Sequence, residues 1–209
     1  MSSAWHPATL SDRKPAGGGL TRIVLVPSAD VAATHVVPGQ YVEVRVQGQT
    51  GYFVLSSDPG GLPWELVMRA GGGASDVLLV MPLPGAVEVT AAIGDGFPVA
   101  DVRGRELLVA LGGTGIAAGP PVVRRRIRDG DAAATRVWVG ARGDDLPLAG
   151  EIEAWRAAGV EVTVANGFVD ESMRGPIAAA PAAPIFAVGA EAMVAALRAL
   201  APGRVHTNH

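Results

Sequence analysis

Cysteine is absent from this 209-residue sequence, and its absence excludes several chemistries at once. A chain without thiols has no disulfide, no cysteine nucleophile, no cysteine-bound zinc and no cysteine-bound iron–sulfur cluster of its own. The four histidines are His6, His35, His206 and His209, and none of them shows the spacing of metal ligands. We therefore expect no metal site and no iron–sulfur cluster in this chain.

An excess of basic charge is also missing. The sequence has 17 Lys and Arg against 20 Asp and Glu, a net charge of −3, whereas nucleic-acid-binding proteins carry basic patches. The one basic run comprises Arg124, Arg125 and Arg126, and its apolar neighbours are typical of an amphipathic helix. We interpret the run as the solvated face of that helix, and we expect no nucleic-acid partner.

Long apolar runs are missing as well. No stretch reaches the roughly 18 consecutive apolar residues that indicate a transmembrane helix, so no membrane span is expected. The first residues lack the charged segment and apolar core of a secretory signal. These absences predict a cytoplasmic protein.

Aliphatic residues, glycine and proline are plentiful, and the two halves of the chain arrange them differently. Up to about residue 101, short β-branched runs are separated by glycine and proline, a pattern typical of an antiparallel barrel or sandwich. One helix is predicted in this half, over residues 75–81. The predicted strands cover residues 5–10, 20–26, 41–46, 51–57, 64–69 and 87–90.

From about residue 104, apolar strands alternate with helices, which indicates a parallel sheet covered on both faces. The predicted fold class is therefore a two-domain chain, with an antiparallel β-barrel at residues 1–101 and an α/β parallel-sheet nucleotide-binding domain at residues 102–209. The segment 167–183 is rich in Ala, Gly and Pro, and we interpret it as a loop with at most a short helix. The predicted strands are 106–111, 136–139, 160–164, 185–188 and 204–207, and the predicted helices begin at residues 120, 152 and 191.

The strongest local signal for a ligand is the glycine-rich segment 112–119, between an apolar strand and a helix. Such a turn exposes backbone N–H groups at a helix N-terminus, where phosphates bind, and glycine lets a ligand approach the backbone closely. Its spacing departs from G-x-G-x-x-G, and Arg142, not an acidic residue, follows the next strand. A tight turn without a ligand is the alternative interpretation.

A second glycine-rich segment, residues 71–75, precedes the predicted helix of the first half. Its backbone amides and the Ser75 hydroxyl either cap that helix or hold a phosphate. From the residues alone, the cap is the favoured interpretation.

Taken in order, these segments resemble the ferredoxin–NADP⁺ reductase superfamily over essentially the whole chain. The resemblance implies FAD in the barrel, NAD or NADP in the α/β domain, and hydride transfer from NAD(P)H to the flavin, with electrons passing on to an unknown acceptor that is a protein or a small molecule. The matching segments are 38–42 ("PGQY"), 66–75 (the loop for the FAD pyrophosphate), 84–98 (the end of the barrel), 112–117 ("GGTGI"), 140–142 and 188–193.

The resemblance also implies the residues that bind the cofactors, although it implies no certain catalytic residue. Tyr52 or Phe53 would pack against the isoalloxazine, and Ser56 or Ser57 would bond to its polar edge. Arg142 would contact a 2′-phosphate or lie on the surface, and His209 would cover the flavin or form a frayed end. The full predicted set is Tyr52, Phe53, Val54, Leu55, Ser56, Ser57, Gly72, Gly73, Ser75, Gly113, Thr114, Gly115, Arg142, Gly189 and His209.

Two departures from the family pattern favour a second hypothesis. The family's R-x-Y-[ST] motif matches residues 51–54, where Gly51 replaces the arginine that contacts the FAD pyrophosphate. The loss of such a charge-assisted contact costs about 1.5–3 kcal/mol of binding. Val188 replaces the family's cysteine near the nicotinamide. The alternative function is therefore a catalytically degenerate module of the same fold that binds a nucleotide or a protein partner for regulation.

Overall fold

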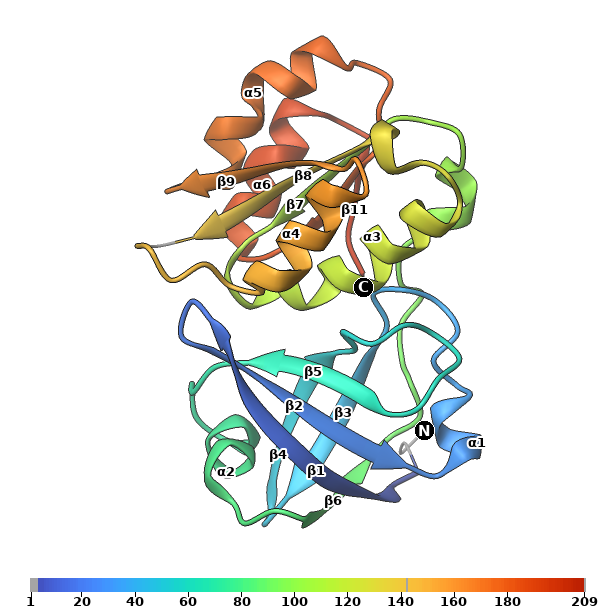
Figure 1. The fold of residues 1–209 in the computed structure, drawn as a ribbon, viewed down its shortest axis with the longest axis vertical. Coiled ribbons are helices and arrows are strands. Elements are labelled where there is room, and N and C mark those ends of the chain that lie inside the picture. The colour runs from blue at the N-terminus through green and yellow to red at the C-terminus, as the bar shows by residue number, and fades with distance from the viewer. Residues whose placement is uncertain (1–3, 142, 209) are drawn as a thin grey trace.

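The alternating strands of the first half form a six-stranded antiparallel sheet, which we call the barrel half (Figure 1). The computed structural model describes residues 4–141 and 143–208. The strand order is β4-β3-β6-β1-β2-β5, and a bridge between Leu55 and Leu66 brings the two edges together, so the sheet is barrel-like without closing. Its strands are β1 (His6–Gly17), β2 (Leu20–Pro27), β3 (Tyr41–Val46), β4 (Gln49–Val54), β5 (Trp64–Met68) and β6 (Gly85–Val89).

The period of two along these strands determines which side chains form the barrel core. In β3, Val42, Val44 and Val46 are buried, and the residues between them are half-buried on the outer face. The helix α2 (Ala74–Val80) buries Ala74 and Leu78 in the same core, which confirms the helix predicted over 75–81. A short helix, α1 (Ala29–Ala32), connects β2 to β3 and was not predicted.

The second half is a five-stranded parallel sheet, which we call the α/β half, in the order β11-β10-β7-β8-β9. Every residue of β7 is buried, because its alternate side chains enter two different cores. The strands are β7 (Leu107–Leu111), β8 (Thr135–Ala141), β9 (Glu161–Asn166), β10 (Ile185–Val188) and β11 (Val205–His206). Helices α3 (Gly119–Arg128) and α4 (Ala149–Ala157) pack on one face, and α5 (Val169–Ala179) and α6 (Glu191–Leu200) on the other.

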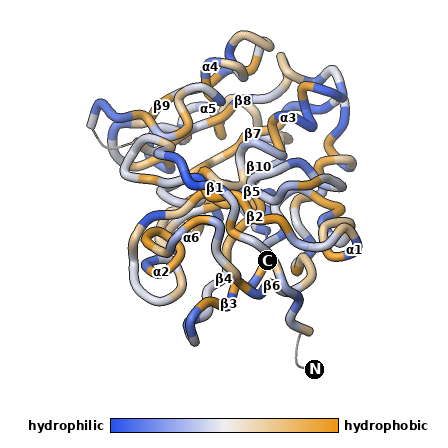
Figure 2. The backbone as a smooth tube through the Cα atoms, turned by 60° about the horizontal axis from the view of Figure 1, so that its bottom comes forward, coloured by the Kyte–Doolittle hydropathy of each residue, from blue (hydrophilic) through white to orange (hydrophobic). Residues whose placement is uncertain are grey.

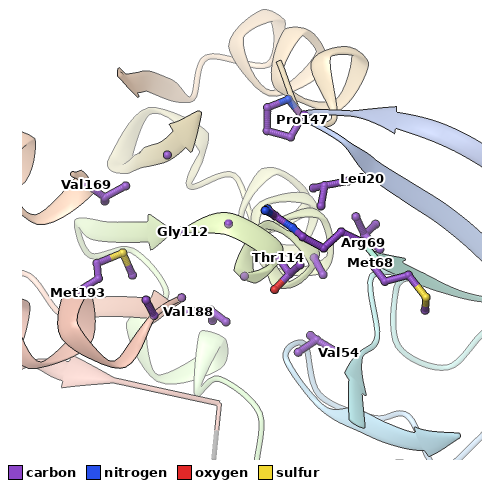
Figure 3. Close-up of a pocket in the computed structure, with 18 of the residues that line it drawn as sticks. Leu20, Val54, Met68, Arg69, Gly112, Thr114, Pro147, Val169, Val188 and Met193 are labelled. Atoms are coloured by element: carbon purple, nitrogen blue, oxygen red, sulfur yellow. The ribbon is translucent and has the colours of Figure 1, made fainter. Parts of the chain in front are cut away.

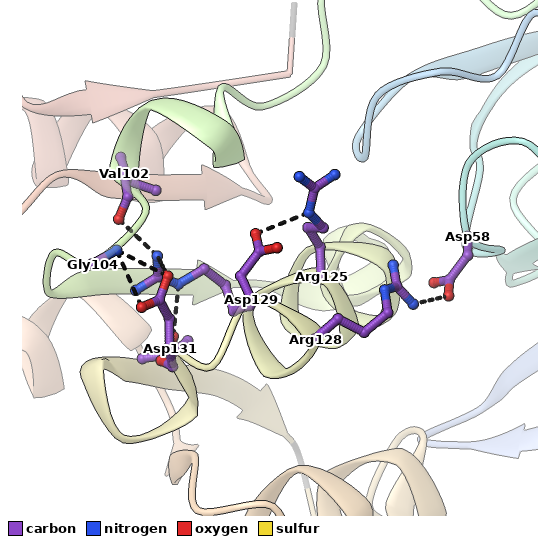
Figure 4. A network of polar contacts seen from close by, with 9 residues as sticks. Asp58, Val102, Gly104, Arg125, Arg128, Asp129 and Asp131 are labelled. Carbon is purple, nitrogen blue, oxygen red and sulfur yellow. Dashed lines mark hydrogen bonds and ion pairs between the residues drawn. The ribbon is translucent and has the colours of Figure 1, made fainter.

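Two sequence-based interpretations of helices are wrong. The segment read as a loop with at most a short helix contains the 11-residue helix α5, because Val169, Met173 and Ile177 recur every four residues and are all buried. The basic run is not a solvated face throughout. Although the end of α3 is hydrophilic (Figure 2), Arg126 is fully buried and donates hydrogen bonds to Thr135, Asp131 and backbone carbonyl groups (Figure 4).

A short 3₁₀ helix, η1 (Val99–Val102), lies in the segment that connects the two halves. The predicted domain boundary, between residues 101 and 102, falls inside this helix and stays a prediction. Among the residues that the structure describes, no helix is long and apolar enough to cross a membrane.

A hairpin of the barrel half reaches across to the α/β half. At the tip between β1 and β2, the Gly18 N–H donates a hydrogen bond to the Asp145 carboxylate at 2.9 Å. The Leu148 N–H in turn donates to the Ala16 carbonyl oxygen at 2.6 Å. The loop that leads from β8 to α4 is thereby bonded to the barrel half.

Ion pairs join the halves near the start of α4. Arg22 of β2 lies 3.3 Å from the Glu151 carboxylate, which also pairs with Arg124 of α3. Asp58, in the barrel half, pairs with Arg124 at 3.6 Å and with Arg128 at 2.5 Å. We refer to these five residues as the interdomain ion cluster.

Candidate functional site

A cavity of about 830 Å³ lies between the two halves, at the carboxyl edge of the parallel sheet (Figure 3). The barrel half contributes the β1–β2 hairpin, β4, the end of β5 and Ser75, and the α/β half contributes the loops that follow β7, β8, β9 and β10. This volume falls within the range of small-molecule and cofactor sites, about 300–1,000 Å³. Open α/β sheets bind their ligands at this edge.

The glycine-rich loop after β7 forms the 3₁₀ helix η2 (Gly113–Ala118), and its glycines serve two purposes. A Cβ on Gly115 would lie 2.2 Å from the Val188 carbonyl oxygen, so close packing against β10 requires this glycine. Gly113 has φ +57, and a Cβ there would lie 3.7 Å from the Arg69 guanidinium across the cavity. The Gly115 N–H donates to the Gly112 carbonyl oxygen at 2.9 Å. Gly113 is therefore the glycine that offers close backbone approach to a ligand.

Arg69 is a cavity residue that the sequence analysis missed. It follows β5 directly, and Figure 3 shows its side chain extending into the cavity toward Thr114 and the loop after β7. Among the described lining residues it is the single cation, and it forms no hydrogen bond or ion pair within the described chain. A guanidinium in this position is suited to a phosphate.

The pairing of β4 with β3 decides which aromatic ring faces outward. Phe53 lies opposite Val42, so it shares the inner face of the barrel, and its ring is 3.0 Å from where a Cβ on Gly51 would lie. Tyr52 lies on the outer face, 66% exposed, with its ring edge-on to Tyr41 at 5.9 Å. Both line the cavity, but the geometry favours Tyr52 as the seat for a planar ring.

The register also moves the family's R-x-Y motif by one residue. If Tyr52 is its tyrosine, Thr50 occupies the arginine position, so neither alignment of this strand supplies an arginine.

The serines that follow β4 are not brought to the cavity. Leu55 and Ser56 are fully buried, and the Ser57 hydroxyl accepts a hydrogen bond from the Glu65 N–H at 3.2 Å. These three residues were predicted at the flavin. The structure uses them to connect β4 to β5, whereas Val54 does line the cavity.

The glycine-rich loop of the barrel half satisfies part of its own backbone. The Asp76 carboxylate accepts hydrogen bonds from the Gly71 N–H at 3.0 Å and the Gly72 N–H at 3.1 Å. These two bonds lower the pKa of Asp76 below its usual value. The Ser75 hydroxyl donates to the Gly72 carbonyl oxygen at 2.9 Å. The self-capped arrangement leaves Ser75 on the cavity wall, with Gly72 and Gly73 outside its lining.

The loops after β9 and β10 complete the cavity. Gly189, predicted near the nicotinamide, lines it between Val188 and Met193. Phe168 and Asp170, at the start of α5, also line it, and they were missed because this segment was read as a loop. Arg142 and His209 lie outside the described residues.

The chain next to His209 packs on the barrel half. The Asn208 side chain is buried and donates a hydrogen bond to the Gly39 carbonyl oxygen at 2.9 Å.

Of all the predicted site residues, the structure brings eight to the cavity: Tyr52, Phe53, Val54, Ser75, Gly113, Thr114, Gly115 and Gly189.

No family model matches the chain. It is 26% identical over 178 residues to the fruit protein pKIWI502 of Actinidia deliciosa, which covers 76% of this chain and 56% of that protein. It is 30% identical over 109 residues to the electron transfer subunit of dihydroorotate dehydrogenase B (NAD(+)) of Shouchella clausii, which covers 48% of this chain and 41% of that protein. The chain spans about half the length of the curated relatives it matches.

Solved structures match the whole fold. The TM-score is 0.85 with the cytochrome P450 reductase GcoB of Amycolatopsis, at 20% identity over 100% of this chain and 71% of that one. The TM-score is 0.80 with a ferredoxin reductase in carbazole 1,9a-dioxygenase, at 19% identity, and the match covers 100% of this chain and 70% of that one. The TM-score is 0.74 with a flavohemoglobin of Malassezia yamatoensis with bound FAD and heme, at 14% identity, and the match covers 97% of this chain and 59% of that one. These likenesses confirm the predicted fold class.

Proposed function

Because the chain has the two-part fold of the ferredoxin–NADP⁺ reductase superfamily, we propose that it is an FAD-dependent NAD(P)H oxidoreductase. The observation that carries the proposal is the cavity, which is lined by Tyr52 and Arg69 of the barrel half and by the Gly113 loop of the α/β half. FAD and NAD(P)H bound there would supply hydride transfer from nicotinamide to flavin, with electrons passing on to a protein or small-molecule acceptor.

The walls of the cavity fit these two groups. Tyr52 presents an exposed aromatic face, and Val54 beside it adds an apolar surface for a flat ring. The Arg69 guanidinium, which has no ion-pair partner among the described residues, lies next to the backbone of Gly113 and provides a charge for a phosphate. The fit is poorest at the loop 71–75, where Asp76 already holds two backbone amides.

The chain's own residues would act by positioning rather than by acid–base chemistry. Arg69 and the Gly113 backbone would fix the phosphates of the dinucleotide, and so set how far its nicotinamide reaches toward Tyr52. Val188, the last residue of β10, and Met193, in the first turn of α6, give the nicotinamide end of the cavity apolar walls that would exclude water.

A second candidate function is a module of this fold that binds a nucleotide or a protein partner without turnover. The observation that favours it is the occupied loop of the barrel half. Asp76 places a negative charge where the family resemblance puts the FAD pyrophosphate, and neither Thr50 nor Gly51 supplies the family's arginine. Both features weaken FAD binding.

The visible spectrum of the purified protein separates the two candidates. For the oxidoreductase, we expect flavin absorbance, either as isolated or after addition of FAD and removal of the excess, and anaerobic bleaching by NADH or NADPH. A protein that takes up no FAD, or whose flavin neither nucleotide reduces, would contradict the oxidoreductase and favour the module. Tyr52→Ala should lower FAD affinity, whereas Tyr41→Phe keeps the neighbouring ring and serves as the control.

A further inference from the structure

The order of the parallel strands determines where the two ends of a dinucleotide would lie. The loop after β7 is central, with β10 on one side and β8 and β9 on the other. Strands β4 and β5 of the barrel half approach the central loop, so the reacting end belongs near Tyr52 and the loop after β10. With the phosphates on the central loop, the adenosine half extends over the ends of β8 and β9.

The residues at this adenosine end differ in character from the rest of the cavity. Gly140 and Ala141 end β8 with almost no side chain, and Phe168 follows β9 with 71% of its surface exposed. Asp170 is the single acidic residue among the described residues that line the cavity. It forms no hydrogen bond or ion pair with any other described residue, and so its carboxylate is available to a ligand.

A free carboxylate distinguishes the two nicotinamide dinucleotides. It accepts hydrogen bonds from the 2′- and 3′-hydroxyls of an unmodified adenosine ribose, as an acidic residue does in other dinucleotide-binding folds. NADP carries a phosphate on the same 2′-oxygen, and its charge is repelled by a carboxylate at close range. Here the acidic residue lies in the first turn of α5, after β9, and not at the end of β8, where the sequence led us to look for one.

We propose that Asp170 makes this site select NADH over NADPH. The inference rests on the proposed function, because it assumes that the cavity binds a nicotinamide dinucleotide. The exposed Phe168 ring, on the same loop, offers the adenine a face on which to stack. The Arg69 guanidinium lies by Gly113, at the phosphate position, and so it serves both dinucleotides equally.

The chain provides a matched control for Asp170. Glu171 is the next residue, it lies in the same first turn of α5, and it has the same charge, but it does not line the cavity. Asp170→Asn and Glu171→Gln therefore change the net charge and the charge at the helix N-terminus equally. Only the first removes a charge from the cavity.

The test measures binding of ADP-ribose and of 2′-phospho-ADP-ribose by isothermal titration calorimetry, together with NADH and NADPH. We expect the unmodified protein to bind the forms without the 2′-phosphate about tenfold more tightly, the size expected for charges a few ångströms apart in water. Asp170→Asn should remove most of this preference, and Glu171→Gln should leave it unchanged.

Three results would overturn the inference: a preference for the 2′-phosphorylated forms, no change of preference in Asp170→Asn, or an equal change in both variants. Because ADP-ribose has no nicotinamide, its binding is independent of flavin chemistry. A protein that binds ADP-ribose selectively but is never reduced would contradict the proposed oxidoreductase and leave the role of Asp170 supported. A protein that binds none of the four ligands would contradict both.

Discussion

At the scale of single residues, the two backbone N–H groups that Asp76 occupies bear on the proposed binding of FAD. Asp76→Ala removes its charge and frees the N–H groups of Gly71 and Gly72. FAD affinity should then rise by about tenfold, the equivalent of one charge-assisted hydrogen bond, as measured by flavin fluorescence titration. Asp30→Ala, an exposed acidic residue outside the cavity, is the control. Unchanged or weaker FAD binding in Asp76→Ala would show that this loop does not hold the flavin phosphates.

Site residues that belong to a local sequence motif could be predicted from the sequence. Site residues that belong to no such motif could not. Gly113 was predicted because a glycine-rich turn between a strand and a helix is a local feature. Arg69 follows β5, whereas Phe168 and Asp170 lie at the start of α5, and only the folded sheet edges bring these two segments together. The choice between Tyr52 and its neighbour depended on the register of β4 against β3, because a run of apolar residues has no alternation to reveal its faces.

At the scale of elements, the hydrophobic period and the turn residues were sufficient to predict a helix or strand wherever a single period dominated the segment. The helix predicted to start at residue 191 is α6 (Glu191–Leu200), and the strand predicted over 185–188 is β10. Helix α5 was not expected at its full length because Gly175 and Pro176 suggest a break, and Pro176 does lie inside the helix, where it removes one backbone hydrogen bond. Burial of Met173 in the core outweighs this local preference.

One buried arginine bonds helix α3 to its surroundings, and its contribution to stability can be tested. The Arg126 guanidinium binds the Asp131 carboxylate at 2.8 Å and the Val102 carbonyl oxygen at 2.7 Å, and so ties α3 to the end of η1 and to the turn that follows α3 (Figure 4). Arg126→Met leaves the buried Asp131 carboxylate without its cationic partner and with only the Gly104 N–H as a donor, and the free energy of unfolding in urea should fall by about 3–5 kcal/mol.

Arg125 is the matched control for this substitution. Its side chain is half-buried and pairs with Asp129 one turn later, so Arg125→Met should cost no more than about 0.5 kcal/mol. Similar losses in the two variants would show that the network around Arg126 does not stabilise the fold.

At the scale of the whole molecule, the cavity exists only because the halves are held in one arrangement. No sequence motif predicted the contacts that hold the two halves in this arrangement. The hydrogen bond from the Leu148 N–H to the Ala16 carbonyl oxygen joins backbone groups, which carry no sequence signal. The ion cluster joins charged residues that look like ordinary surface residues along the chain, such as Arg22 and Glu151. Relative placement of the halves was therefore beyond sequence-based prediction.

Glu151 is the residue through which this arrangement can be perturbed without touching the cavity. Its side chain is only 15% exposed and lies between Arg22 of the barrel half and Arg124 of α3. Glu151→Gln keeps the size and removes the charge, so docking of the halves should weaken by about 1–3 kcal/mol. We expect faster hydrogen exchange at the β1–β2 hairpin tip and weaker binding of any dinucleotide that contacts both halves.

The control is Glu161→Gln, because Glu161 pairs with Arg136 inside the α/β half and is 59% exposed. This exposed pair contributes at most about 1 kcal/mol and bridges no boundary between the halves, so hydrogen exchange at the hairpin tip should not change. Equal exchange in both variants, or no change in Glu151→Gln at low ionic strength, would contradict a role of the ion cluster in holding the halves. Added salt should reproduce part of the Glu151→Gln effect in the unmodified protein, since it screens the partly exposed pairs of Asp58 most strongly.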